Sequence, residues 1–199
     1  MVLEGAPSKQ FHRLAPLIVE KLKSNHRCFY ANGPEMAAGM RAYLDANGFL
    51  VAHEVERGAL VFGTQQSHLI EGHFDPNRVL SMVEAIIEQA AQDGFDGLWG
   101  CGDIGWKLGS DRDVDLLMAY ERGVEEVAQA RPGFSCVCQY HVDTLPADFA
   151  RSAFSSHRSV YVNEAVSLAN PYYDAQGTSK AQVHDMLSWR RLAAQEDFV

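Results

Sequence analysis

One stretch of the sequence, residues 74–106, constrains the fold more than any other. It predicts a helix that has Asp75 as its cap and Pro76 as its first residue and that ends at Gly94. An apolar run over residues 98–102 follows. Asp caps free backbone N–H groups and Pro has none to satisfy, so the pair favours a helix start. A helix followed by a short apolar strand is typical of a parallel sheet covered by helices. Asp103 stands where the strand should end, and ligands usually bind at this carboxyl edge.

The rest of the chain continues this alternation of strands and helices. The apolar periodicity predicts further helices over residues 12–23, 34–46, 111–131 and 144–155. Further strands are predicted over residues 27–31, 60–62, 134–140 and 160–162, and we expect the last of them to be parallel to the others. We expect a poorly ordered start at 1–10, a polar loop at 65–72 and a C-terminal helix at 178–199. The predicted fold class is three-layer α/β, a single domain over residues 10–199 with a mostly parallel sheet and helices on both faces.

Composition and charge exclude several classes of partner. The net charge of -9 would repel a phosphate backbone, so we expect no direct nucleic-acid binding. The N-terminus does not resemble a signal peptide, and no apolar run approaches the roughly 18 residues that cross a bilayer. The four cysteines lie within or beside apolar runs, which favours reduced, buried thiols. These features predict a soluble, cytoplasmic protein without a membrane partner.

The candidate ligand-binding residues are Asp103, Trp106, Tyr140, Cys138 and Tyr30. Asp103 could accept a hydrogen bond from a ligand or hold a cation, whereas the alternative is a turn acid. Trp106 could stack on a ligand, and a core tryptophan is equally consistent with the pattern. Tyr140 could reach the same crevice as Asp103. Strand alternation places Cys138 on the same face as Cys136, where both thiols can also be core residues, and places Gln139 on the other face.

No catalytic or cofactor motif is present in the sequence. The phosphate-binding pattern Gly-x-x-x-x-Gly-Lys-Ser/Thr and the nucleophile pattern Gly-x-Ser-x-Gly are both missing, so we predict no catalytic residues. A metal could be bound by some of Cys28, Cys101, Cys138, His157 and Asp103. However, Cys-x-Cys within a strand is a poor zinc chelate and no Cys-x-x-Cys turn occurs, so we predict no metal and no cofactor. We interpret Glu121 as a surface carboxylate, and we interpret His68 and His73 as solvated loop histidines.

Four segments resemble, in order, those of one known family. They are GHFDPNRVL at 72–80, GFDGLWGCGDIGW at 94–106, CVCQYHVD at 136–143, and SSHRSVYV to NPYY between 155 and 173. With the helix, turn and strand of residues 34–62, they resemble the MEDS family over about residues 10–175. This family is the sensory domain of methanogens and methylotrophs found in the dichloromethane-responsive regulator, and it resembles the RecA-like fold of the circadian-clock ATPase without the phosphate loop. Two departures are Asp103 in place of the family's Glu, and one N-terminal strand–helix unit that we expect to be missing.

The resemblance implies a non-catalytic sensor of small molecules, often hydrocarbon derivatives. Because no DNA-binding or kinase module is recognised in the chain, we expect the signal to pass to a separate transcriptional or kinase partner. An alternative is a degenerate RecA-like nucleotide-binding protein or ATPase that uses Asp103 to hold magnesium. A third interpretation is an interaction module whose C-terminal helix forms a homodimer.

Overall fold

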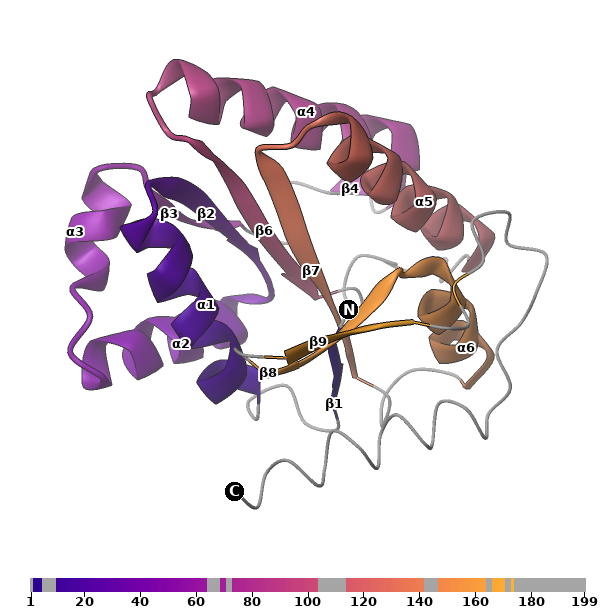
Figure 1. Ribbon diagram of the computed structural model, residues 1–199, viewed down its shortest axis with the longest axis horizontal. Helices are drawn as coiled ribbons and strands as arrows, with labels where there is room; N and C mark the ends of the chain where they lie inside the picture. Colours follow the sequence, from indigo (N-terminus) through magenta and orange to yellow (C-terminus); the bar gives the residue numbers. More distant parts are fainter. Residues whose placement is uncertain are drawn as a thin grey trace.

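A computed structural model describes residues 2–4, 10–63, 69–70, 73–103, 114–141, 147–163, 166–170 and 173. Its centre is a five-stranded sheet with the strand order β1-β7-β6-β2-β3, in which each neighbouring pair is parallel (Figure 1). The strands are β1 (Val2–Glu4), β2 (His26–Ala31), β3 (Leu60–Gly63), β6 (Gly97–Asp103) and β7 (Phe134–His141). The predicted α/β class with a parallel sheet is confirmed.

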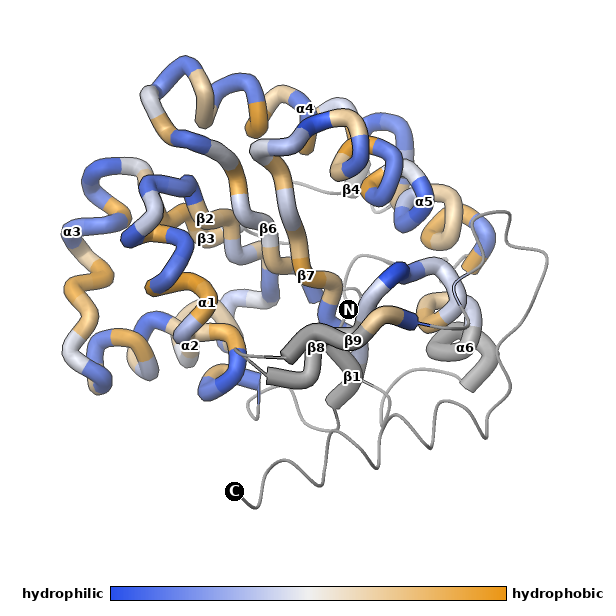
Figure 2. The backbone as a smooth tube through the Cα atoms, in the orientation of Figure 1, coloured by the Kyte–Doolittle hydropathy of each residue, from blue (hydrophilic) through white to orange (hydrophobic). Residues whose placement is uncertain are grey.

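Helices cover both faces of this sheet (Figure 1). One face carries α1 (Phe11–Lys23), α2 (Pro34–Ala46) and α3 (Val51–Glu56). The other carries α4 (Pro76–Gln92) and α5 (Val114–Ala130), with α6 (Ala147–Ser156) packed beside α5. Apolar and polar segments alternate along α4 and α5 in Figure 2, as expected for helices that bury one side. Each face therefore has its own apolar core. No helix in the described part of the chain is both long and apolar enough to cross a membrane.

The unit formed by α4 and β6 follows from local sequence signals. The Asp75 carboxylate accepts hydrogen bonds from the backbone N–H groups of Asn77 at 3.0 Å and Arg78 at 3.3 Å, as expected for a helix cap. Gly94 then adopts a φ of 85°, a conformation that favours glycine, and ends the helical segment. These contacts confirm the predicted start and stop of the helix.

The two helices on this face approach each other closely at a glycine. A Cβ atom added at Gly123 of α5 would lie 2.3 Å from Cδ1 of Leu80 on α4. A larger residue would therefore push the helices apart at this crossing. Because Gly123 has no side chain, α4 and α5 can pack closely above the sheet.

Three parts of the structure differ from the sequence predictions. Val2–Glu4, within the segment expected to be poorly ordered, forms β1 and pairs with β7. With α1, it supplies a strand and a helix ahead of β2, the kind of unit that we expected to be missing. Strand β8 (Ser159–Asn163) does not join the main sheet as a parallel strand, but pairs antiparallel with β9 (Val166–Ala169) in a separate two-stranded sheet. Its connection to β9 is too short for a parallel crossover, so a hairpin forms instead.

The predicted polar loop also contains strand residues. Strands β4 (Leu69–Ile70) and β5 (His73–Phe74) form a second antiparallel pair ahead of α4. The predicted helix at 178–199 lies outside the described residues, as do Trp106 and His68.

Candidate functional site

The predicted ligand-binding residues lie on opposite faces of the sheet. Tyr30 belongs to the core beneath α1, whereas Cys138 and Tyr140 belong to the core beneath α4 and α5. In register, Asp103 pairs with Gln139 and not with Tyr140. Paired residues of parallel strands point to the same face, so Asp103 lies on the α1 side and Tyr140 on the other. The two therefore do not share a crevice.

A buried layer of polar side chains fills the α1 side at the carboxyl ends of the strands. The Asn32 amide donates to Tyr30 Oη at 3.2 Å and to Gln139 Oε1 at 3.0 Å. The Cys101 thiol donates to the same Gln139 oxygen at 3.3 Å, and Gln139 Nε2 donates to Gln10 Oε1. This layer links three strands to the start of α1. Burial satisfied by hydrogen bonds is what a structural polar layer requires.

Asp103 is part of this environment. Asp103 is the last residue of β6 and is only 8% exposed. Burial is the main cause that raises the pKa of Tyr30, and the nearby Cys101 and Asp103 raise it further. Sequence analysis singled out Asp103 and Tyr30, but it missed Asn32 and Gln139. An Asn before Gly-Pro is typical of a turn, so the sequence gives no sign that Asn32 bonds to the buried Tyr30 and Gln139.

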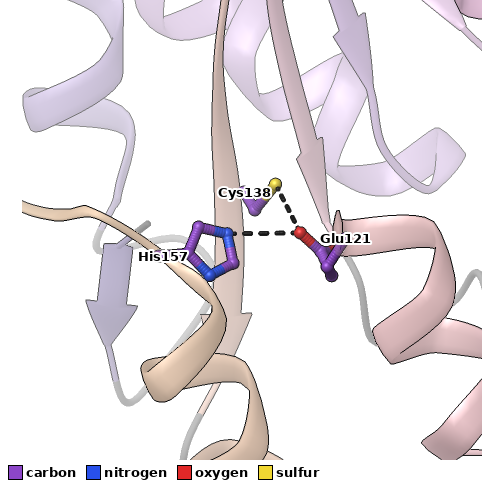
Figure 3. Close-up of side chains that lie close together, drawn as sticks. All are labelled: Glu121, Cys138 and His157. Atoms are coloured by element: carbon purple, nitrogen blue, oxygen red, sulfur yellow. Dashed lines mark hydrogen bonds and ion pairs between the residues drawn. The ribbon is translucent and has the colours of Figure 1, made fainter. Parts of the chain in front are cut away.

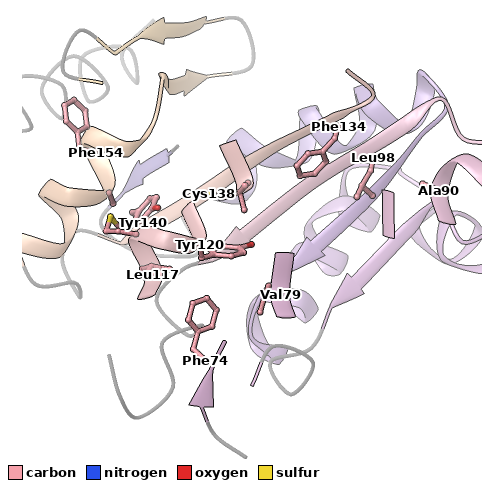
Figure 4. Close-up of a cluster of buried hydrophobic side chains, with 13 residues drawn as sticks. Phe74, Val79, Ala90, Leu98, Leu117, Tyr120, Phe134, Cys138, Tyr140 and Phe154 are labelled. Atoms are coloured by element: carbon pink, nitrogen blue, oxygen red, sulfur yellow. The ribbon is translucent and has the colours of Figure 1, made fainter. Parts of the chain in front are cut away.

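An apolar pocket lies on the other face, between the sheet and helices α4 and α5. Its volume is about 70 Å³. Among the predicted residues, Cys138 contributes to its wall. The remaining wall comes from β2, β6 and β7 and from the two helices: Phe29, Ala31, Val79, Met82, Val83, Ile86, Leu98, Gly100, Cys101, Gly102, Tyr120, Val124, Phe134, Cys136 and Val137. Figure 4 shows some of these side chains, among them Val79, Tyr120 and Cys138, within the buried cluster on this side of the sheet.

The pocket owes its space to glycines in β6. Leu98 faces α4 and α5, and the next two positions on the same face are Gly100 and Gly102. A Cβ atom at Gly100 would lie 3.5 Å from Cys136 Cβ and 3.7 Å from an edge atom of the Phe134 ring, both ordinary contact distances. A side chain at this position would therefore occupy the pocket. Glycine leaves the pocket open.

A cluster of three ionisable groups lies beyond the pocket wall, between α5, β7 and the end of α6 (Figure 3). The Cys138 thiol donates to Glu121 Oε2 at 3.2 Å, and His157 Nε2 lies 3.2 Å from the same oxygen. Glu121 is only 3% exposed, so its interpretation as a surface carboxylate is wrong. Its side of α5 faces β7 and α6, an arrangement that only the packing determines.

The surroundings of Cys138 and His157 raise the pKa of both groups. A hydrogen bond with Cys136, burial and the charge of Glu121 all raise the pKa of the Cys138 thiol. Burial by itself lowers the pKa of His157, but hydrogen bonds with Cys138 and Glu121 outweigh it and raise the pKa to about 9. At neutral pH, His157 and Glu121 therefore form an ion pair beside a protonated thiol. Such a thiol is a poor nucleophile, because the thiolate is the reactive form.

The fold and these sites define an α/β domain with an apolar pocket on one sheet face and no phosphate-binding loop in its sequence. A family model matches residues 2–158, and it describes MEDS, the methanogen/methylotroph, DcmR sensory domain. The chain therefore belongs to the MEDS family of sensory domains. No curated protein matches the chain.

Proposed function

We propose that this domain senses a small, mostly apolar molecule and passes the signal to a separate regulatory protein. The observation that carries the proposal is the apolar pocket between β6, β7, α4 and α5. Membership of a sensory family supports the general role. The pocket supports a binding place on the α4 and α5 side of the sheet, away from Asp103.

The size and lining of the pocket favour a particular class of ligand. An engineered apolar cavity of about 150 Å³ binds benzene. A volume of about 70 Å³ is roughly half of that, so the ligand would have only a few heavy atoms. The wall is mostly apolar, and the Cys136 and Cys138 side chains offer weak polar contacts. Short halocarbons and short alcohols fit this description, as hydrocarbon derivatives of small size.

The position of the pocket supports a signalling mechanism. A ligand there would contact both helices as well as the sheet, and would stabilise the arrangement in which α4 and α5 lie at one spacing. Burying two or three carbon groups is worth about 2 kcal/mol, at about 0.8 kcal/mol for each. A difference of that size between two states shifts their ratio by more than tenfold. The exposed surfaces of α4 and α5 would then present a different shape to the partner.

The test compares two variants on opposite faces of the sheet. Thermal unfolding is measured with dichloromethane, chloroform and short alcohols for the wild type, Gly100→Val and Asp103→Ala. The proposal expects the midpoint to rise in the wild type and in Asp103→Ala, but not in Gly100→Val, where the side chain fills the pocket. Loss of the effect in Asp103→Ala alone would place the ligand on the α1 side. No stabilisation of the wild type by any compound would refute the proposal.

The same variants separate the sensor from the nucleotide-binding alternative. Calorimetry with ATP and magnesium would give heat that disappears in Asp103→Ala if this carboxylate holds the metal of a nucleotide. The sensory proposal expects no such heat in the wild type.

A further inference from the structure

We propose that Glu121, Cys138 and His157 bind a divalent transition-metal ion of the zinc type. Each residue offers one ligand atom, and the three atoms lie within 4.8 Å of one another. They come from α5, from β7 and from the residue that follows α6, so the packing of three separate elements brings them together. Figure 3 shows the thiol and the imidazole both directed at the Glu121 carboxylate.

Two of the three spacings between ligand atoms are slightly shorter than those around a tetrahedral ion. Zinc bonds of about 2.1–2.3 Å place neighbouring ligand atoms roughly 3.4–3.8 Å apart. Glu121 Oε2 lies 3.2 Å from Cys138 Sγ and 3.2 Å from His157 Nε2. Small side-chain rotations would open these contacts enough to admit an ion.

The imidazole is already oriented for such a role. His157 Nδ1 lies 2.7 Å from the Ala153 carbonyl oxygen and 3.0 Å from Ser156 Oγ. The hydrogen bond from Nδ1–H to the carbonyl fixes the orientation of the ring, so Nε2 is the atom that would bind the ion, with release of its proton and of the Cys138 thiol proton. The Tyr140 ring packs edge-on against the imidazole, with centroids 5.5 Å apart, and restricts its rotation further. These contacts hold the ring with Nε2 directed at the cluster.

The ligand types select the class of metal. One thiolate, one imidazole and one carboxylate suit zinc and related transition metals, whereas magnesium and calcium prefer oxygen ligands throughout. Three protein ligands leave a fourth position on a tetrahedral ion. A second cavity of about 80 Å³ borders all three residues and has Arg158 and Ser159 in its wall, so there is room for a water molecule at that position.

A different use of the same residues fits the geometry less well. In a nucleophilic triad the imidazole stands between the thiol and the carboxylate, and uses one nitrogen for each. Here a single Glu121 oxygen contacts both partners, while the second imidazole nitrogen of His157 faces the backbone. Convergence of three donors on one point is the arrangement of a cation site. The proposal does not depend on ligand binding in the apolar pocket.

Cobalt(II) provides a direct test on the full chain after treatment with a chelator. We expect one equivalent to bind, with visible bands of tetrahedral intensity and a near-ultraviolet thiolate-to-cobalt charge-transfer band. Cys138→Ser should lose the charge-transfer band, whereas Cys101→Ser, a buried thiol on the opposite face of the neighbouring strand, should keep it. Glu121→Gln should keep the band but weaken binding at least about tenfold, since even outer-shell changes cost that much.

Two results would overturn the proposal. One is a folded wild type that binds no stoichiometric cobalt. The other is a charge-transfer band that persists in Cys138→Ser. If Cys138→Ser fails to fold, Glu121→Gln decides, because an unchanged cobalt affinity in that variant excludes the carboxylate as a ligand and overturns the site.

Discussion

Replacing Gly100 with Ala should stabilise the ligand-free protein, because the added methyl group enters the apolar pocket. Gly100 lies within β6, and it is not among the described glycines with a positive φ, so alanine adopts its backbone without strain. The new Cβ would have its nearest neighbours at 3.5 and 3.7 Å, which are attractive contacts and not collisions. The substitution therefore adds apolar contact where the wild type has space.

The expected gain has two sources. A compatible Gly→Ala change stabilises by about 0.4–1 kcal/mol, because the unfolded chain loses freedom. Burying one methyl group adds about 0.8 kcal/mol. Together these give about 1–2 kcal/mol, which corresponds to a rise of roughly 2–8 °C in the unfolding midpoint for a chain of this size.

Gly97→Ala is the matched control in the same strand. Its Cβ would lie 2.1 Å from the Gly133 carbonyl oxygen, a backbone atom that cannot move aside cheaply. The same chemical change should therefore destabilise by about 1–3 kcal/mol, as overpacking does. Urea and thermal unfolding, followed by circular dichroism, measure both variants. A lower midpoint for Gly100→Ala would refute the reasoning, because it would mean that α4 and α5 pack directly onto β6.

Three further predictions concern stability. Asp75→Ala should lower the free energy of unfolding by about 1 kcal/mol in urea, through the lost helix cap, while Asp75→Asn keeps the acceptor and most of the stability; equal losses would contradict capping. Arg27→Lys should cost more stability than Asp93→Asn, because Arg27 also donates to a backbone carbonyl and stacks on an aromatic ring, whereas Asp93 is exposed; the reverse order would contradict this. With a chelator present to remove metal ions, the contribution of protonated His157 to the free energy of unfolding should be complete below about pH 6.5. This contribution should be lost as the pH rises through about 9, because folding raises the pKa of His157. Urea midpoints over this range should fall in the wild type and stay flatter in His157→Gln, and identical slopes would contradict it.

Several features of the fold were predictable because they depend on neighbours in sequence. Pro34–Ala46 is helical as predicted, and Asp75 and Gly94 bound α4 as their residue types indicate. The predicted alternation of side chains along β7 is also confirmed, because Cys138 bonds to Glu121 on one face of the sheet and Gln139 bonds to Asn32 on the other. Capping, turn formation and strand alternation act over a few residues, so a single sequence reveals them.

The contents of the candidate sites were less accessible. Gly100 and Gly102 can be read from the sequence. However, no local pattern predicts that α4 and α5 cover this face of β6 and leave a pocket beside the two glycines. Glu121 has the spacing of an ordinary helix residue, and its burial depends on where α6 packs. The sequence search for a metal site considered short Cys spacings, whereas the residues of this cluster come from α5, from β7 and from the position after α6.

By itself, the sequence determined the alternating α/β class, the helix and strand positions of the central unit and the family to which the chain belongs. Only the tertiary structure decided which residues meet. The pairing of Asp103 with Gln139 separates Asp103 from Tyr140, and the docking of α5 and α6 on β7 brings Glu121, Cys138 and His157 together. The physical reason is range: local propensities set the backbone of each element, but strand register and helix packing set which side chains face each other.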